Sequence, residues 1–391
     1  MKKAFVSLLA AAVVLLQAAD ASAYIGLCCG KCGGNMPLNI LGGGVPETNE
    51  FRFKVGPMFM RMDGLRDGTD RLDADDLLGM PVMMGMPTGR YMAVPTGMDM
   101  TMVNMAAGFS FTDDFFGGIM FMWRRNDMDM EFNSMMKSMT GKDGFTMESE
   151  GMADTMVMAK YRLHADDPLV PTSQVSLLLG LSLPTGSINE LNRTHPVATR
   201  RAELLPYSMQ LGSGTFDPKV GILYQGSSSP LWWGANLIYT ARFYDNSRDW
   251  RLGDELTLDL YAMYQLRYDL VAQLQLGGRS WGGIRGEMDS VASGASGRAT
   301  QGDPTSPYAT PLYDPDNYGG NKVSVTAGLQ WQPFPLQIVE IDFGVPVYQD
   351  LNGPQMEEDY RVMFTWYLEL PTPSSIRYMG GERQGAARLG F

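Results

Sequence analysis

The 391-residue sequence is poor in cysteine, histidine and positive charge. Its only cysteines are Cys28, Cys29 and Cys32, and its only histidines are His164 and His195. So few histidines leave little for histidine-based catalysis or a histidine-rich metal site. Lysine and arginine number 31 against 43 aspartates and glutamates, a formal net charge of -12. Because nucleic acid requires a basic face, we expect no nucleic-acid partner.

Long apolar runs are also missing after the first residues. No later segment has 18 consecutive apolar residues, which excludes helical membrane spans. Residues 4–16 form an apolar run after Lys2 and Lys3, and the small residues ASA follow at 21–23. Because a spanning helix needs about 20 apolar residues, this pattern predicts a cleaved signal peptide over residues 1–23. An uncleaved membrane anchor is the alternative.

Catalytic motifs are not evident. His164 precedes ADDP in an expected turn, and His195 precedes Pro196 in an expected loop, so no Ser-His pair stands out. The acidic stretch RDGTDRLDADD at 66–76 lacks the spacing and the closing glutamate of a calcium loop. We therefore expect a protein that is not an enzyme and that needs no cofactor.

The dominant pattern is alternation of apolar and polar residues with period two. It is clearest in residues 255–266 (ELTLDLYAMYQL), 322–331 and 361–370. These segments are about ten residues long, the 9–11 that a tilted strand needs to cross a bilayer, whereas strands in globular proteins most often have five or six residues. Their polar faces also carry charge, as the inner wall of a membrane barrel does.

Twelve strands of this kind are expected. They span residues 51–62, 98–111, 115–126, 151–163, 173–184, 216–225, 231–243, 253–267, 269–281, 321–332, 335–347 and 358–370. Long connections, such as 63–97, 185–215 and 282–320, follow the odd strands, and short turns follow the even ones. An outer-membrane barrel has this layout, whereas the alternative, a soluble β-sandwich or propeller, does not require it.

The sequence therefore predicts an all-β fold, a transmembrane antiparallel up-and-down β-barrel of about 12 strands over residues 51–370. A Cys/Gly-rich leader (24–50) precedes it, and a tail (371–391) follows. Because twelve is even, both termini lie on the same side, which the short turns identify as the periplasm. We expect the protein in the cell outer membrane, with lipid and a small solute as partners.

Several motifs also resemble a known family. Pro184, Thr185 and Gly186 end one expected strand, GSG at 212–214 and DP at 217–218 open the next, and GDE at 253–255 precedes a further one. In these motifs, residues 150–370 resemble the "meta-pathway of phenol degradation" outer-membrane family. The resemblance implies a barrel that transports hydrophobic or aromatic compounds, and it supplies no site residues.

Methionine is unusually frequent, with 31 residues, most of them between Met58 and Met158. Aligning the strands by their apolar faces predicts an inner wall, or solute path, of Met58, Met60, Met100, Met102, Met120, Met122, Met156, Met158, Asp259, Arg279, Glu340, Asp342 and Arg361. The methionines could be flexible filler, a polarizable path for aromatic solutes, or thioether ligands of Cu(I). The loop sequence GMPVMMGMP at 79–87 keeps the third interpretation open.

The three cysteines lie in GLCCGKCGG at 26–34, within the leader. They could form one disulfide, Cys29 with Cys32 or Cys28 with Cys32, in an oxidising compartment. Cys28, Cys29 and Cys32 could instead bind a metal as thiolates, although a closed zinc site has four ligands. A leftover cysteine could also link to a periplasmic partner.

These observations predict an outer-membrane barrel that passes or binds a small, apolar or aromatic solute by diffusion through a partly methionine-lined lumen. The alternative is a structural or binding barrel, plugged by its own loops, that handles copper through its methionine and cysteine clusters.

Overall fold

The computed structural model describes residues 36–43, 48–167, 171–375 and 377–378. The predicted signal peptide, the three cysteines and residues 379–391 lie outside this part of the chain. Within it, no helix is long and apolar enough to cross a membrane.

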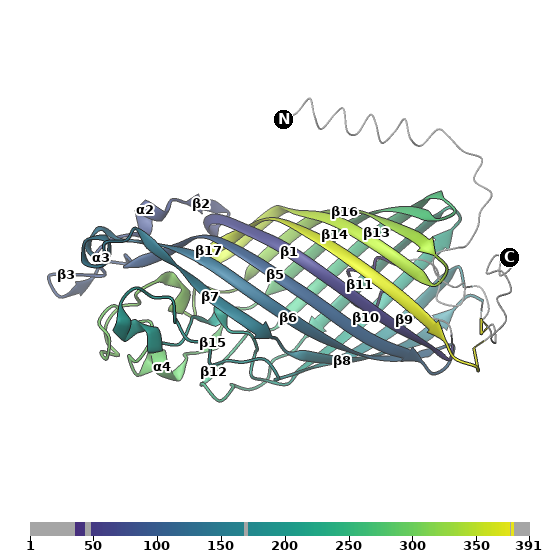
Figure 1. The fold of residues 1–391 in the computed structure, drawn as a ribbon, viewed down its shortest axis with the longest axis horizontal. Coiled ribbons are helices and arrows are strands. Elements are labelled where there is room, and N and C mark those ends of the chain that lie inside the picture. Colours follow the sequence, from purple (N-terminus) through teal and green to yellow (C-terminus); the bar gives the residue numbers. More distant parts are fainter. Residues whose placement is uncertain (1–35, 44–47, 168–170, 376, 379–391) are drawn as a thin grey trace, which may run out of the picture.

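Eleven labelled strands form a closed antiparallel ring (Figure 1). In ring order they are β1 (Glu50–Gly68), β5 (Ala93–Ser110), β6 (Phe115–Phe132), β8 (Thr155–Ala165), β9 (Ser173–Leu183), β10 (Asp217–Ser228), β11 (Leu231–Thr240), β13 (Glu255–Arg267), β14 (Leu270–Trp281), β16 (Gly320–Phe334) and β17 (Gln337–Pro371). Strand β17 pairs with β1, so the ring has no edge. The predicted antiparallel up-and-down barrel is confirmed.

Strand β17 is long enough to cross the wall twice. Its first part pairs with β16 as far as Leu351, and its second part pairs with β1 from Leu351 to Pro371, both antiparallel. The backbone N–H of Glu369 donates to the Leu336 carbonyl at 2.9 Å, so the two parts lie side by side. A ring in which all neighbours are antiparallel needs an even number of crossings. The eleven labelled strands therefore supply the twelve crossings that the sequence predicts.

The wall is taller on one side than the sequence pattern indicates. Strands β1, β5 and β6 have 19, 18 and 18 residues, well beyond the 9–11 that cross a bilayer. Strand β7 (Gly144–Met152) extends the sheet along β6, and β2 (Asp70–Leu72) extends it along β1. The expected long loop between the last two strands is a tight turn instead, with Gly353 at φ 72°.

The two ends of the barrel differ. At the short-turn end, turns of a few residues join the strands, and the start of β1 and the end of β17 lie there (Figure 1). At the loop end, the long connections carry the remaining elements: α2 (Ala74–Leu77), β3 (Val82–Met83), β4 (Met86–Pro87), α3 (Ser134–Thr140), η2 (Ala198–Ala202), η3 (Tyr207–Met209), β12 (Trp250–Arg251), β15 (Arg285–Gly286), α4 (Asp289–Ala292) and η4 (Pro311–Tyr313).

Side-chain exposure along β13 shows which face points outward. Leu256, Leu258 and Leu260 are 42%, 40% and 41% exposed, whereas Tyr261 and Met263 are 4% and 1% exposed. Successive side chains point to opposite faces of a strand. The apolar face therefore covers the outside of the barrel, as lipid contact requires, and the polar face lines the inside.

Asp154 holds both ends of the long connection between β9 and β10. Its carboxylate accepts hydrogen bonds from the backbone N–H of Gly186 (2.9 Å) and from the backbone N–H and hydroxyl of Ser213 (both 2.8 Å). These contacts join the PTG motif at 184–186 to the GSG motif at 212–214. They anchor the connection to the residues that join β7 and β8.

We expect Asp154→Ala to loosen this connection. Losing an acceptor for several hydrogen bonds destabilises the closed connection by about 1–3 kcal/mol. The connection then opens more often, so trypsin cleavage after the exposed Arg193 should accelerate about tenfold or more. Asp166→Ala is the control, because Asp166 accepts from the backbone N–H of Thr172 and Ser173 at the other end of the barrel. Equal cleavage of both variants and the wild type would contradict this role of Asp154.

Candidate functional site

Methionines form one sector of the inner wall, on β1, β5, β6 and β8. Cross-strand partners in the register are Met58 with Met102, Met60 with Met100, and Met120 with Met156. Directly opposed residues point to the same face. Met156 and Met158 are buried, while six others are partly exposed: Met58, Met60, Met100, Met102, Met120 and Met122.

Paired charges occupy the other side of the ring, from β10 to β17. The ion pairs are Arg242 with Asp217 (3.3 Å), Arg279 with Glu255 (2.9 Å), Arg361 with Glu358 (3.1 Å), and Lys322 with that same glutamate. Met60 lies opposite Arg361 across the β1–β17 pairing, so the two sectors meet there. Because each of these cations has a carboxylate partner, the charged sector carries little net charge.

Residues 36–43 close the barrel at the short-turn end. Glu340 on β17 accepts hydrogen bonds from the backbone N–H of Leu38 (2.8 Å) and Asn39 (2.9 Å). Gln330 on β16 donates to the Met36 carbonyl at 3.1 Å and to Glu340 at 2.5 Å. Further donors to this segment are Lys54 to the Leu38 carbonyl, Gln275 to Asn39 and Asn236 to the Leu41 carbonyl. We call residues 36–43 the plug.

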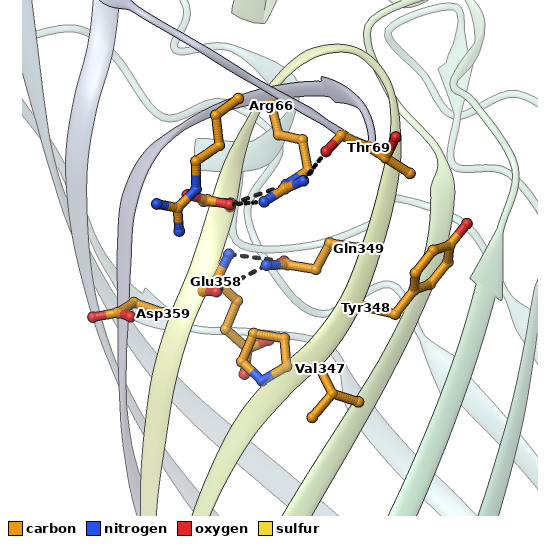
Figure 2. Close-up of a pocket in the computed structure, with 10 residues that line it drawn as sticks. Arg66, Thr69, Val347, Tyr348, Gln349, Glu358 and Asp359 are labelled. Atoms are coloured by element: carbon orange, nitrogen blue, oxygen red, sulfur yellow. Dashed lines mark hydrogen bonds and ion pairs between the residues drawn. The ribbon is translucent and has the colours of Figure 1, made fainter. Parts of the chain in front are cut away.

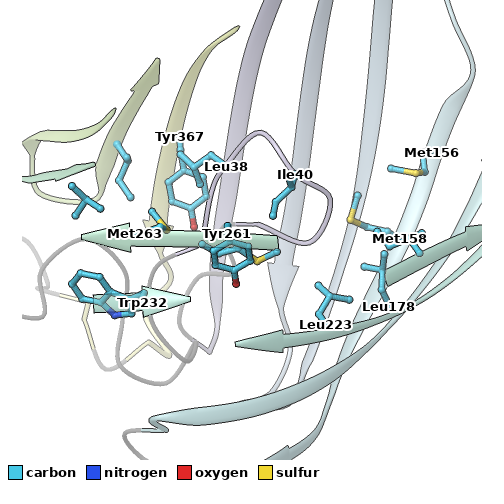
Figure 3. Close-up of a cluster of buried hydrophobic side chains, with 14 residues drawn as sticks. Leu38, Ile40, Met156, Met158, Leu178, Leu223, Trp232, Tyr261, Met263 and Tyr367 are labelled. Atoms are coloured by element: carbon cyan, nitrogen blue, oxygen red, sulfur yellow. The ribbon is translucent and has the colours of Figure 1, made fainter. Parts of the chain in front are cut away.

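Apolar contacts hold the plug as well. Leu38 and Ile40 are buried in a cluster with Leu178, Leu223 and Tyr261 from the inner wall, and Figure 3 shows the plug as a loop surrounded by the strands. Gly42 has φ 88°, and a Cβ there would lie 2.5 Å from Leu223. Glycine is therefore required where the plug turns against the wall.

The loop end is closed by a second cluster. Buried methionines of β5, β6 and β7 pack with side chains of the two longest connections: Met98, Met128, Met130 and Met147 with Leu205, Met209, Ala309 and Leu312. Arg200 joins those two connections. It donates to the carbonyls of Arg298 and Ala299 at 3.1 and 2.8 Å and pairs with Glu203 at 3.1 Å.

The predicted path residues fall into two groups. Asp259, Arg279 and Arg361 lie among the charges in the middle of the barrel, with the partly exposed methionines. Glu340 and Asp342, only 0% and 1% exposed, lie near the short-turn end. There Glu340 binds the plug, and Asp342 accepts a hydrogen bond from Gln273. The metal site predicted from Cys28, Cys29 and Cys32 lies outside the described residues.

The plug is the functional element that the sequence analysis missed. It belongs to the predicted leader, where glycines suggested a featureless segment. The sequence did contain a pattern that indicates an ordered segment here, because Met36, Leu38 and Ile40 alternate with polar or small positions as in a strand. Its binding partner, Glu340, is separated from Leu38 by 302 residues, a distance over which one sequence shows no pairing.

A pocket of about 360 Å³ interrupts the wall between the two parts of β17 (Figure 2). There the side-chain amide of Gln349 donates to the Glu358 carbonyl and accepts from the Glu358 backbone N–H, both at 3.0 Å. Pro346, which has no N–H, also lines the pocket. A side chain thus satisfies backbone groups at this position, where the two parts of β17 are less tightly joined.

His195 is buried in the loop-end closure. Its ring centroid lies 4.5 Å from that of Phe145 and 5.9 Å from that of Phe132, and its Nδ1 accepts from the Val197 backbone N–H at 3.1 Å. Burial, and then the nearby positive charge of Arg200, lowers the pKa of His195 to about 4. The imidazole is therefore neutral at pH 7.

Acid should loosen the loop-end closure through His195. Since the folded-state pKa of about 4 lies below the ordinary 6.5, the stability from neutral His195 is fully present above pH 6.5. This stabilisation is lost as the pH falls through 4, and the loss in free energy reaches roughly 3 kcal/mol. Amide hydrogen exchange of residues 190–205, corrected for intrinsic rates, measures the change. His195→Phe keeps a ring and cannot titrate, so an equally steep response in that variant would contradict the prediction.

The sequence matches a family model described as "Putative MetA-pathway of phenol degradation" over residues 92–310. Among solved structures, the fold is similar to an outer membrane channel from Pseudomonas putida F1, with TM-score 0.51, 10% identity and coverage of 84% of this chain and 97% of that chain. Weaker likenesses include the TodX deltaS2S3 mutant (TM-score 0.37, 8% identity, 83% and 91% covered) and CymD (0.34, 7%, 83% and 89%), both monoaromatic hydrocarbon channels. No curated protein matches the sequence.

The family match covers more than half of the chain and includes the PTG, GSG and GDE motifs noted in the sequence. It extends from the residues before β5 to the second of the two longest connections, so it includes most of the methionine sector. At 10% identity, the Pseudomonas putida channel supports the barrel fold. The chain belongs to the MetA-pathway of phenol degradation family.

Proposed function

We propose that this protein is an outer-membrane channel through which a small, apolar or aromatic solute passes by diffusion. The observation that carries the proposal is the middle of the barrel, where inward-facing methionines remain partly exposed between two closed ends. Inner side chains that are partly exposed face space that no other side chain fills. Thioether sulfurs interact favourably with aromatic rings, so this space suits a ring.

The charged sector favours a neutral solute over an ion. Its cations are paired with carboxylates, so it offers hydrogen bonds and little net attraction. A molecule such as phenol could place its ring against Met58 and Met102 and its hydroxyl toward Arg279 or Asp259. This arrangement is consistent with a family named for phenol degradation.

The direction of the barrel follows from its two ends. Outer-membrane barrels have short periplasmic turns and longer external loops. The short-turn end, with the plug and the end of β17, is then periplasmic, and the apolar belt around the outside contacts outer-membrane lipid. A solute that enters from outside must pass the loop-end cluster and then the plug.

Passage requires the plug to shift, and Glu340 is its principal anchor. We expect Glu340→Ala to increase the frequency of open-channel events in planar bilayers at least tenfold, because two backbone N–H groups of the plug lose their acceptor, at about 1–3 kcal/mol each. Glu357→Ala is the matched control, since Glu357 is another buried carboxylate of β17 and pairs with Arg66 (2.6 Å) near the loop end, away from the plug. Equal event frequencies in the two variants would contradict the anchoring role.

Solute passage is tested directly by phenol uptake into proteoliposomes. We expect uptake that depends on the protein and that falls severalfold in Met102→Asp, because a desolvated carboxylate disfavours an adjacent aromatic ring. Met139→Asp, on the exposed helix α3, should leave uptake unchanged. Folded wild-type protein that gives no uptake above empty liposomes would refute the channel and favour a permanently plugged structural barrel.

A further inference from the structure

The β3–β4 hairpin exposes a group of methionines away from the barrel interior. Met83, Met84 and Met86 are 59%, 94% and 67% exposed, and Figure 1 shows β3 at the extreme loop end of the molecule. The methionines of the loop-end cluster, such as Met98 and Met128, are almost fully buried by comparison. The hairpin methionines therefore do not serve as packing filler.

The hairpin register brings two of these side chains together. Met83 is the direct cross-strand partner of Met86, and such partners have Cβ atoms about 4.5–5.5 Å apart on one face. The hairpin is extended by a hydrogen bond from the Thr88 backbone N–H to the Pro81 carbonyl at 3.0 Å. Flexible methionine side chains on this frame can bring their sulfurs to a common point.

The turn itself is unusual for methionine. Met84 and Gly85 have φ 52° and 80°, the two positive values of a type I′ hairpin turn, in which Asn-Gly is strongly preferred. A long side chain in the left-handed region is disfavoured, and such outliers cluster at functional sites. Met84 occupies the first turn position, between Met83 and its cross-strand partner Met86, and a ligand role gives the disfavoured residue a reason to be present.

The chemistry of the hairpin selects a particular kind of ligand. Residues 79–88 (GMPVMMGMPT) contain no charged residue and no histidine, so the hairpin offers neither carboxylates nor imidazole. Thioethers are soft ligands that favour Cu(I) over Mg²⁺, Ca²⁺ or Mn²⁺. Ag(I), a cation of the same charge and closed d shell, has the same preference.

We propose that the β3–β4 hairpin binds one soft monovalent cation, Cu(I) or Ag(I), through the sulfurs of Met83, Met84 and Met86. The site lies on the loop end, outside the solute path, and is independent of the channel function. It would collect the cation at the surface from which the loops project.

The first experiment titrates Ag(I) nitrate in halide-free buffer into folded protein that carries Cys28→Ser/Cys29→Ser/Cys32→Ser, because thiolates bind Ag(I) more tightly than thioethers do, and follows binding by calorimetry. This cysteine-free protein is the wild-type reference for the variants that follow. The wild-type reference should bind one Ag(I) per protein at its highest-affinity site. The double variant Met83→Leu/Met86→Leu should lose this site or bind Ag(I) there at least 100-fold more weakly. The matched control is Met135→Leu/Met139→Leu, which removes two exposed methionines of α3 (39% and 60%) and should bind as the wild type does. Unchanged binding in the hairpin variant would overturn the proposal.

Met84→Asn separates a ligand role from a structural one. Asparagine suits the first position of a type I′ turn, so the hairpin should form at least as well. The affinity for Ag(I) should still fall about tenfold, because one sulfur is gone. An unchanged affinity would refute the three-sulfur site. Cu(I) competition with a chromophoric chelator should rank the variants in the same order, and a different order would also count against the site.

These variants also keep the two proposals distinguishable. None of the three hairpin methionines lines the barrel interior, so phenol uptake should be equal in wild type, Met83→Leu/Met86→Leu and Met84→Asn. Uptake that falls together with Ag(I) binding would overturn an independent surface site. Heat-modifiable migration on a gel confirms that each barrel is folded before either measurement.

Discussion

The pairing of β1 with β17 is the constraint on which the rest of the structure depends. Lipid offers no hydrogen-bond partners, so every backbone N–H and C=O of a membrane strand must be satisfied by a neighbouring strand. Only a closed ring meets that requirement for all strands at once. The apolar outer face and the polar inner face then follow from the alternation of side chains along each strand.

The periodicity of the sequence was sufficient to predict the ring of strands, because each strand shows its own local alternation of apolar and polar residues. The twelve expected segments correspond to crossings of the wall, including both parts of β17, and an even count follows from antiparallel neighbours. The inward placement of Met58 and Met102 follows from the same alternation. The sequence analysis missed the parts of β6 and β7 that extend beyond the bilayer. There both faces of the sheet can carry polar residues, such as Arg125 and Glu150, so the alternation is lost.

The closures at the two ends could not be predicted in this way. They depend on contacts between distant segments, Leu38 with Glu340 at one end and Arg200 with Ala299 at the other, and neither follows a periodic pattern. A glycine-rich leader looks the same whether it is free or bound inside a barrel. Glu340 was predicted as part of a solute path because a charged residue on an inner face has no other local explanation.

The plug also determines an order of events during biogenesis. Its donors and acceptors come from β1, β11, β14, β16 and β17, so its complete binding site exists only when β17 has paired with β1. The plug precedes β1 in the chain and is synthesised before any of these partners. The full set of contacts to the plug therefore forms only in the completed barrel.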